Sequence, residues 1–182
     1  DLLIERLPLG PGDTAADLGA GTGYFSLPMA ERVGPEGRVL AVDIQPEMLD
    51  LLAARAKRMG VTNVDLILGE PTSPRLPRET VDLILLVDAY HEFSYPREMG
   101  LAMAGALRPD GRLVLIEYRA EAPSVPIKRL HKMSKAQVHR ELTAHGFELV
   151  RELDTLPWQH AMFYQRDDGP GTAREPTPWR GR

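Results

Sequence analysis

The sequence contains no cysteine, which excludes disulfide bonds, thiolate metal centres and cysteine nucleophiles. No apolar run approaches the length of a membrane span, so we expect no transmembrane segment. There is no excess of basic charge either, because 22 Lys and Arg residues against 26 Asp and Glu residues give a net charge of −4. A chain with this balance has no general attraction to nucleic acid or anionic membranes, and we expect neither as a partner.

The chain of 182 residues is 43% hydrophobic, which predicts one domain with a sizeable core. We expect this domain to cover residues 1–165. From Arg166 onward the sequence has no apolar periodicity, which indicates a C-terminal tail over 166–182. The chain begins at Asp1, without methionine and inside an apolar helical pattern, so a preceding leader or helix stays open. We expect a cytoplasmic location.

Apolar strand-like runs alternate with helical patterns, which predicts an α/β fold with a mostly parallel sheet. The run Leu83–Val87 is continuously apolar, as strands covered by helices on both faces should be. Ser134 followed by Gln137 matches a helix-capping pattern, and residues 108–111 form a turn signal. The expected strands are 14–18, 38–43, 63–68, 81–87 and 112–118, and the expected helices are 22–33, 46–59, 96–107 and 134–145.

After Gly146 the pattern changes to two consecutive strand-like runs. Phe147–Leu153 and Ala161–Gln165 are separated by a Leu-Pro-Trp turn and by no helix. This spacing predicts an antiparallel hairpin. A dinucleotide-binding fold would be expected to continue with further βα units instead.

The most informative motif follows the first expected strand, where Asp17-Leu18-Gly19-Ala20-Gly21-Thr22-Gly23 places three glycines at alternate positions. Glycine takes positive φ and lets a ligand lie against bare backbone amides at the start of the next helix. The dinucleotide spacing G-x-G-x-x-G/A needs a small residue where this chain has Tyr24. The motif therefore predicts a nucleotide-binding turn without the dinucleotide spacing. A tight turn without a ligand is the alternative.

Asp43 ends the second expected strand, 20 residues after Gly23. An acid at this place accepts hydrogen bonds from both ribose hydroxyls of an adenosine. Its alternative role is that of a helix cap. Because the following helix is expected to start at Pro46, a favourable first-turn residue, Asp43 is available for a ligand.

These motifs, in this order, resemble the class I S-adenosylmethionine-dependent methyltransferases over nearly all of residues 1–165. The chain is similar to the broad group that includes the ubiquinone and menaquinone biosynthesis methyltransferases. The resemblance implies a Rossmann-like fold with a seven-stranded, mostly parallel sheet, a C-terminal antiparallel hairpin and helices on both faces. It implies S-adenosylmethionine as cofactor and S-adenosylhomocysteine as product. The cofactor-binding residues it implies are Asp17, Gly19, Ala20, Gly21, Thr22, Gly23, Asp43, Ile44, Met48, Gly69, Glu70 and Asp88.

Gly69-Glu70 after the third strand is similar to the family segment in which an acid accepts the adenine amino group. Pro71 departs from the family pattern, because it has no backbone N–H to offer to the adenine ring. Adenine recognition then rests on Glu70 and on packing from Ile44 or Met48. A surface-loop acid is the alternative role for Glu70.

The segment after the fourth strand, Asp88–Phe93, is the candidate for the acceptor side, because ligands of open α/β sheets collect at such carboxyl ends. Methyl transfer is an in-line displacement, and an acceptor that carries a proton must lose it near neutral pH. An unperturbed histidine side chain changes charge in that range, so His91 is the candidate base, with Glu92 orienting it or acting in its place. Tyr90 and Phe93 supply an aromatic wall for the sulfonium. A histidine that only packs is the alternative.

The same segment contains possible metal ligands in Asp88, His91 and Glu92. His131 or His160, from other loops, could add a further ligand. The motif H-E-x-x-H is absent, and two nearby ligands in one loop do not define a site. We therefore expect no metal.

Residues 119–140 carry a local positive charge in an otherwise acidic chain. The stretch contains one acidic residue, Glu121, and six basic residues. This stretch is placed to hold a carboxylate or phosphate of a small-molecule acceptor, and a solvated loop face is the alternative. Glu117 and Tyr118, directly before this stretch, could also face the substrate, although no motif spacing supports this role. The basic residues are Arg119, Lys128, Arg129, Lys132, Lys135 and Arg140.

Two functions follow. The first is an S-adenosylmethionine-dependent methyltransferase acting on a small molecule, and the second is a non-catalytic module that binds the same cofactor as a sensor or scaffold. An NAD(P)-dependent oxidoreductase is opposed by Tyr24 and by the hairpin ending. The absence of cysteine argues against methylation of arsenic, which relies on cysteines in related enzymes. The sequence does not determine the oligomeric state.

Overall fold

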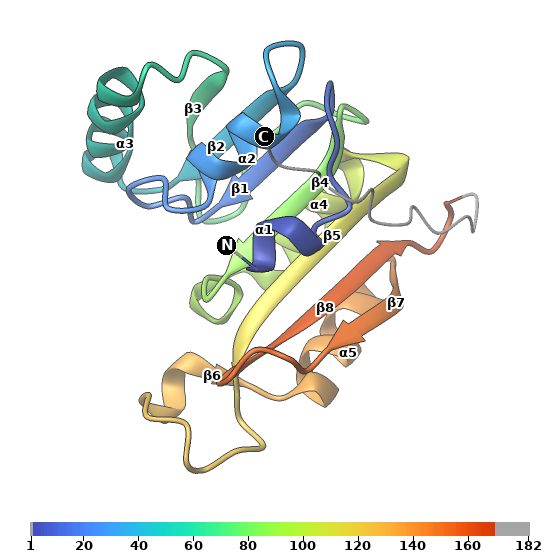
Figure 1. The fold of residues 1–182 in the computed structure, drawn as a ribbon. Coiled ribbons are helices and arrows are strands. Elements are labelled where there is room, and N and C mark those ends of the chain that lie inside the picture. The colour runs from blue at the N-terminus through green and yellow to red at the C-terminus, as the bar shows by residue number, and fades with distance from the viewer. Residues whose placement is uncertain (1, 170–182) are drawn as a thin grey trace.

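A single mixed sheet forms the centre of the structure, a computed structural model that describes residues 2–169 (Figure 1). Its strands lie in the order β3-β2-β1-β4-β5-β8-β7, and the short β6 pairs with β5 beside this path. β1 to β5 pair in parallel, and β8 runs antiparallel to β5 and β7. The strands are β1 (Thr14–Leu18), β2 (Arg38–Asp43), β3 (Val64–Leu68), β4 (Val81–Val87), β5 (Leu107–Arg119), β6 (Lys132–Met133), β7 (Phe147–Leu153) and β8 (Gln159–Arg166).

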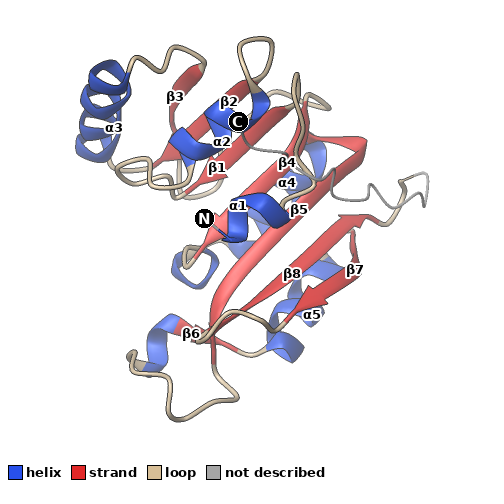
Figure 2. Ribbon diagram, viewed as in Figure 1, coloured by secondary structure: helices blue, strands red, loops and turns tan. Residues whose placement is uncertain are grey.

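Helices cover both faces of this sheet (Figure 2). On one face α1 and α2 bury apolar side chains such as Ile4 and Met29, and α3 packs Leu52 near Ala41 of β2. On the opposite face α4 and α5 bury residues such as Leu142. The predicted α/β fold with a mostly parallel sheet is therefore confirmed. The helices are α1 (Leu2–Arg6), α2 (Ser26–Val33), α3 (Pro46–Met59), α4 (Pro96–Ala106) and α5 (Lys135–Ala144), with short 3-10 turns η1 (Tyr90–Glu92) and η2 (Arg129–His131).

The C-terminal hairpin is confirmed as well. β8 lies between β5 and β7, so that Ala161 pairs with Ile116 on one side and with Leu153 on the other. The seven strands of this path are the predicted seven. β6 is an eighth strand of two residues that the sequence did not predict, and its parallel pairing with the end of β5 positions the preceding η2.

The two predicted boundaries that differ most from the structure were wrong for local reasons, whereas smaller shifts include the start of β8 at Gln159 rather than at Ala161. α2 begins at Ser26 rather than at 22, because Pro28 has no N–H to donate and fits only in the first turn of a helix. β5 begins at Leu107 rather than at 112. The predicted turn at 108–111 is an irregularity within the strand, where Val81 pairs with Leu107 and the next paired residue of β4 is Leu83.

The predicted boundary of the tail at residue 166 falls at the end of β8, whose last residue is Arg166. Most of the predicted tail, residues 170–182, lies outside the described residues. Among residues 2–169, no helix combines the length and the apolar character that crossing a membrane requires.

Candidate active site

The glycine-rich turn after β1 takes backbone conformations that favour glycine. Gly19, Gly21 and Gly23 have φ angles of 77°, 51° and 81°, in the left-handed region. The N–H of Gly19 donates to the carbonyl of Val42 at 2.9 Å, which ties the turn to the end of β2. A Cβ atom added to Gly19 would lie 2.8 Å from Cβ of Ala89 in the segment after β4. The first glycine is therefore required by both its backbone angle and its neighbour.

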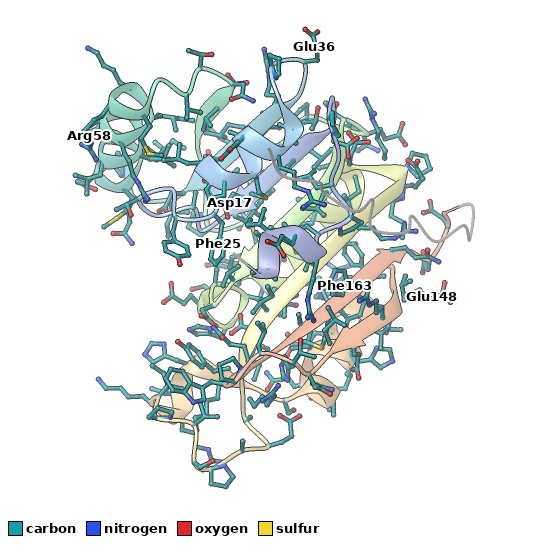
Figure 3. All side chains as sticks on the ribbon, viewed as in Figure 1. Asp17, Phe25, Glu36, Arg58, Glu148 and Phe163 are labelled. Atoms are coloured by element: carbon teal, nitrogen blue, oxygen red, sulfur yellow. The ribbon has the colours of Figure 1, made fainter. Side chains whose placement is uncertain are left out.

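Asp17 lies beneath this turn. Its side chain is buried, and its Oδ2 accepts a hydrogen bond from the Ser26 hydroxyl at 2.6 Å. In Figure 3 it lies among the ribbon elements, whereas Arg58 extends outward from α3. Burial raises the pKa of Asp17 to about 6, although the Ser26 hydrogen bond lowers it, and nearby Asp43 raises it further. Asp17 thus links β1, before the turn, to Ser26 at the start of α2, after it.

Asp43, at the end of β2, bonds to the turn and to the start of α3. Its Oδ2 accepts the N–H of Gly21 at 2.9 Å, and its Oδ1 accepts the N–H of Gln45 at 2.9 Å. Gln45 is the N-cap residue of α3, so Asp43 also supports the start of that helix. A carboxylate offers about four lone-pair sites, so acceptor capacity is left for ligand hydroxyls.

A cavity of about 260 Å³ opens at the carboxyl ends of β1, β2 and β4, where open α/β sheets bind ligands. Six of the twelve predicted cofactor-binding residues line it: Gly19, Asp43, Ile44, Gly69, Glu70 and Asp88. The other six do not line it: Asp17, Ala20, Gly21, Thr22, Gly23 and Met48. The lining also includes Gln45 and Met99, which the sequence did not single out.

Glu70 and Pro71 line the side of the cavity next to β3. The Glu70 carboxylate forms an ion pair with Arg75 at 2.6 Å, so this acid is a partly engaged acceptor. Gly69 is held close to β2, because its N–H donates to the carbonyl of Asp43 at 2.9 Å. Because Pro71 has no backbone N–H, this side of the cavity offers one hydrogen-bond donor fewer, as the sequence predicted.

Asp88 lines the cavity in a strained conformation. Its φ of 50° lies in the left-handed region, which costs a residue other than glycine about 1 kcal/mol. Its Oδ2 accepts a hydrogen bond from Gln159 Nε2 at 2.8 Å, whereas its buried Oδ1 has no partner in the part of the chain that the structure describes. Burial raises the pKa of Asp88, and the bond from Gln159 and the proximity of His91 lower it. Strain together with a spare acceptor is typical of a ligand contact.

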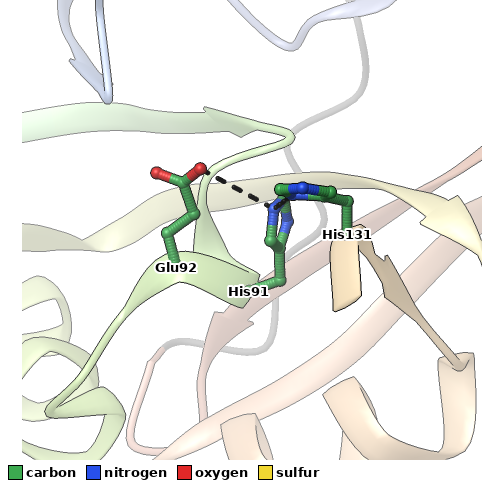
Figure 4. A group of neighbouring side chains, drawn as sticks. All are labelled: His91, Glu92 and His131. Atoms are coloured by element: carbon green, nitrogen blue, oxygen red, sulfur yellow. Dashed lines mark hydrogen bonds and ion pairs between the residues drawn. The ribbon is translucent and has the colours of Figure 1, made fainter. Parts of the chain in front are cut away.

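His91 is held by Glu117, a carboxylate of β5. The ring Nδ1 lies 2.7 Å from Glu117 Oε2, and the backbone N–H of His91 donates to Glu117 Oε1 at 3.2 Å. Burial raises the pKa of Glu117, and His91 lowers it. A neutral His91 ring bound in this way carries its proton on Nδ1 and leaves Nε2 as an acceptor. That nitrogen lies 3.0 Å from Nδ1 of His131 and 3.9 Å from Oε1 of Glu92 (Figure 4).

The other predicted catalytic side chains lie in different surroundings. Tyr90 is buried in the core, and burial raises the pKa of its hydroxyl. Its ring lies 5.4 Å from that of Phe93, which does line the cavity. The prediction of an aromatic wall is therefore wrong for Tyr90, because η1 places this side chain in the core cluster that the sheet shares with α4 and α5. Glu92 lines the cavity with a side chain that is 68% exposed.

The basic segment 119–140 is largely engaged in holding loops together. Arg119 donates to the carbonyls of Asp154 and Leu156, and Lys135 forms an ion pair with Asp154 at 2.6 Å. Lys132 donates to a loop carbonyl. Within residues 2–169 three side chains of the segment have no hydrogen-bond or ion-pair partner: Lys128, Arg129 and Arg140.

Residues 9–165 match a protein family described as a methyltransferase domain. The chain belongs to this family. The resemblance to class I S-adenosylmethionine-dependent methyltransferases is thereby confirmed, and the family is one of enzymes. The similarity to the quinone-biosynthesis group stays a prediction. Membership implies S-adenosylmethionine as cofactor, and six of the residues predicted to bind it line the described cavity.

Curated relatives of the chain are longer and have diverse names. The uncharacterized methyltransferase YcgJ of Bacillus subtilis is 32% identical over 161 residues, which cover 87% of this chain and 62% of YcgJ. Nocamycin O-methyltransferase of Saccharothrix syringae is 34% identical over 113 residues, 62% of this chain and 40% of the relative. The chain therefore spans less than two thirds of either relative.

The fold is shared with a solved S-adenosylmethionine-dependent methyltransferase from Aquifex aeolicus. The two superpose with a TM-score of 0.82 at 24% identity, over 90% of this chain and 92% of the other. This likeness shows that the described arrangement of sheet and helices is that of a methyltransferase domain.

Proposed function

We propose that this chain binds S-adenosylmethionine in the described cavity and transfers its methyl group to a small molecule. The observation that carries the proposal is the meeting of Gly19, Asp43 and Glu70 around one cavity, with the His91 and Glu117 pair directly beside it. One relative is named a nocamycin O-methyltransferase and another, from Halobacterium salinarum, an arsenite methyltransferase. The names of the relatives therefore do not identify the methyl acceptor of this chain.

In this proposal the cofactor lies across the carboxyl ends of β1, β2 and β4. Asp43 accepts hydrogen bonds from the ribose hydroxyls, and Glu70 accepts one from the adenine amino group. The spare Oδ1 of Asp88 is the available acceptor for the amino acid portion of the ligand. When bound, the cofactor supplies a methyl group on a sulfonium sulfur.

The acceptor side is the face of the cavity formed by Glu92 and Phe93, next to His91. The Phe93 ring provides an apolar and polarisable surface beside the sulfonium. Glu117 fixes the orientation of the His91 ring, so that its Nε2 is directed away from β5. The side chains of Lys128 and Arg129, which have no partner among the described residues, are the cations available to an anionic acceptor.

The test is turnover of isotope-labelled S-adenosylmethionine with a panel of small phenols, alcohols and thiols, with and without a carboxylate or phosphate. We expect S-adenosylhomocysteine to form with at least one acceptor, and His91→Ala to lower the rate by about 10²–10⁴-fold. His139→Ala, on the exposed side of α5, is the matched control. Binding of the cofactor without turnover on any acceptor would contradict catalysis and support a sensor or scaffold.

A further inference from the structure

Three side chains beside the cavity direct metal-binding atoms at one point: His91, Glu92 and His131 (Figure 4). Two of them come from η1, and the third comes from η2, which β6 holds beside the end of β5. One ligand atom from each residue lies within 4.8 Å of the other two. We propose that this cluster binds a divalent transition-metal ion through Nε2 of His91, Nδ1 of His131 and the carboxylate of Glu92.

The distances are close to those of a metal site. A tetrahedral ion with bonds of about 2.0–2.2 Å keeps its ligand atoms about 3.3 Å apart. The two histidine nitrogens lie 3.0 Å apart, and Oε1 of Glu92 lies 3.9 Å from Nε2 of His91. The Glu92 side chain is 68% exposed, so it can swing inward without disturbing the core.

Glu117 completes the arrangement behind the first ligand. Histidines that bind metals almost always donate their other ring N–H to a carboxylate or a carbonyl, which fixes the ring and makes the free nitrogen a better ligand. The fully buried Glu117 does this for His91 at 2.7 Å. Glu92 and Glu117 also supply two negative charges for a dipositive ion.

The donor set selects the class of ion. Two imidazoles and one carboxylate suit zinc and its first-row neighbours, whereas magnesium and calcium prefer oxygen ligands alone. Three protein ligands leave a fourth position open for water or a substrate. Because Glu92 also lines the cavity, an acceptor that enters there can reach this ion.

The use of the ion in catalysis rests on the proposed function, although the binding site itself does not. A nitrogen that binds a metal cannot also accept a proton, so the ion replaces His91 as the activating group. An acceptor hydroxyl or thiol on the ion releases its proton to water more readily. The acceptor atom then bonds to the methyl carbon while the carbon–sulfur bond breaks, and S-adenosylhomocysteine leaves.

The experiment is calorimetric titration of the full chain, without a histidine tag and after removal of metals by a chelator. The probes are Zn²⁺ and, separately, Mg²⁺. We expect one Zn²⁺ per chain and no comparable binding of Mg²⁺. His131→Gln and Glu92→Gln each weaken Zn²⁺ binding by at least about tenfold, and Glu117→Gln weakens it about 10–100-fold. His139→Gln, which removes an exposed histidine of α5, leaves the affinity unchanged.

Absence of stoichiometric Zn²⁺ binding, or equal affinity in His131→Gln and the wild type, would overturn the site and leave a hydrogen bond between two histidines. S-adenosylhomocysteine is titrated into the same samples. If it binds where Zn²⁺ does not, the metal site fails and the proposed function stands. If Zn²⁺ binds and the adenosyl ligand does not, the metal site stands and the proposed function fails.

Discussion

Glu117 holds His91 by its ring and by its backbone: one carboxylate oxygen lies 2.7 Å from the ring Nδ1, and the other accepts the backbone N–H at 3.2 Å. The pair joins β5 to the 3-10 turn η1 across the carboxyl edge of the sheet. Because the Glu117 side chain is fully buried and that of His91 is 7% exposed, neither group can exchange its partner for bulk water.

We predict that Glu117→Ala lowers the free energy of unfolding by about 3 kcal/mol, because it leaves the buried Nδ1–H of His91 without an acceptor. Glu117→Gln keeps an acceptor oxygen and should cost less, about 1 kcal/mol. Urea denaturation measures both values. Glu36→Ala, an exposed carboxylate in a turn, serves as control, and an equally small effect of all three variants would contradict the buried pair.

Two glycines of the same turn should respond differently to alanine. Gly19→Ala introduces a Cβ 2.8 Å from Cβ of Ala89 in addition to the left-handed φ. Gly21→Ala meets nothing within 4 Å and carries the backbone cost alone. We expect losses in unfolding free energy of about 3 kcal/mol for Gly19→Ala and about 1 kcal/mol for Gly21→Ala. Equal losses in thermal or urea unfolding would show that the approach of the Ala89 segment is not as described.

Asp17 should make stability fall as pH rises. Its pKa is raised from 3.8 to about 6 in the folded chain, so between these values the folded state keeps a proton that the unfolded state has released. The stabilisation is complete below pH 3.8 and is lost as pH rises through 6. Asp17→Asn removes this dependence, and Asn retains an acceptor for the Ser26 hydroxyl.

Relative to the wild type, Asp17→Asn should therefore gain stability by up to about 3 kcal/mol between pH 4 and pH 7. Urea unfolding of both proteins across this range measures the difference. A difference that stays constant, or that grows toward low pH, would contradict a raised pKa. Binding of S-adenosylhomocysteine to the same variant reports whether this carboxylate contacts the ligand.

Arg119 should stabilise the turn of the C-terminal hairpin rather than bind an acceptor. It donates to the carbonyls of Asp154 and Leu156 at 2.9 Å each. Arg119→Ala should lower the unfolding free energy by about 1–2 kcal/mol. The Arg140 side chain has no partner among residues 2–169, so Arg140→Ala should change the unfolding free energy by less than about 0.5 kcal/mol. Comparable values for the two variants in urea unfolding would contradict this division of the basic segment.

The local features of the fold and of the cofactor side could be predicted from the sequence. Glycine spacing, continuous apolar strands and the cap at Ser134, whose hydroxyl accepts the N–H of Gln137 at 3.1 Å, depend on neighbouring residues alone. The position of Asp43 at a strand end placed it beside the glycine turn, because parallel strands end at one edge of the sheet.

The acceptor side could be predicted only in part. Consecutive residues of η1 face opposite surroundings, so Tyr90 enters the core while His91 meets Glu117, and no periodicity marks a 3-10 turn in advance. His131 reaches His91 because the two-residue strand β6 pairs with β5 across an intervening loop. A contact of this kind depends on tertiary pairing, so the sequence named His131 as a possible metal ligand but could not show that it lies beside His91.

The decisive measurement is calorimetric binding of S-adenosylhomocysteine to the wild type, to Asp43→Ala and to Asp50→Ala, an exposed acid of α3 that serves as control. We expect micromolar binding to the wild type and the control, and a loss of about 100-fold in Asp43→Ala, the value of about two hydrogen bonds to a carboxylate. NADH is titrated into the wild type for comparison. The proposed cofactor site would be contradicted by absence of S-adenosylhomocysteine binding to the wild type, by equal binding to all three proteins, or by tighter binding of NADH than of S-adenosylhomocysteine.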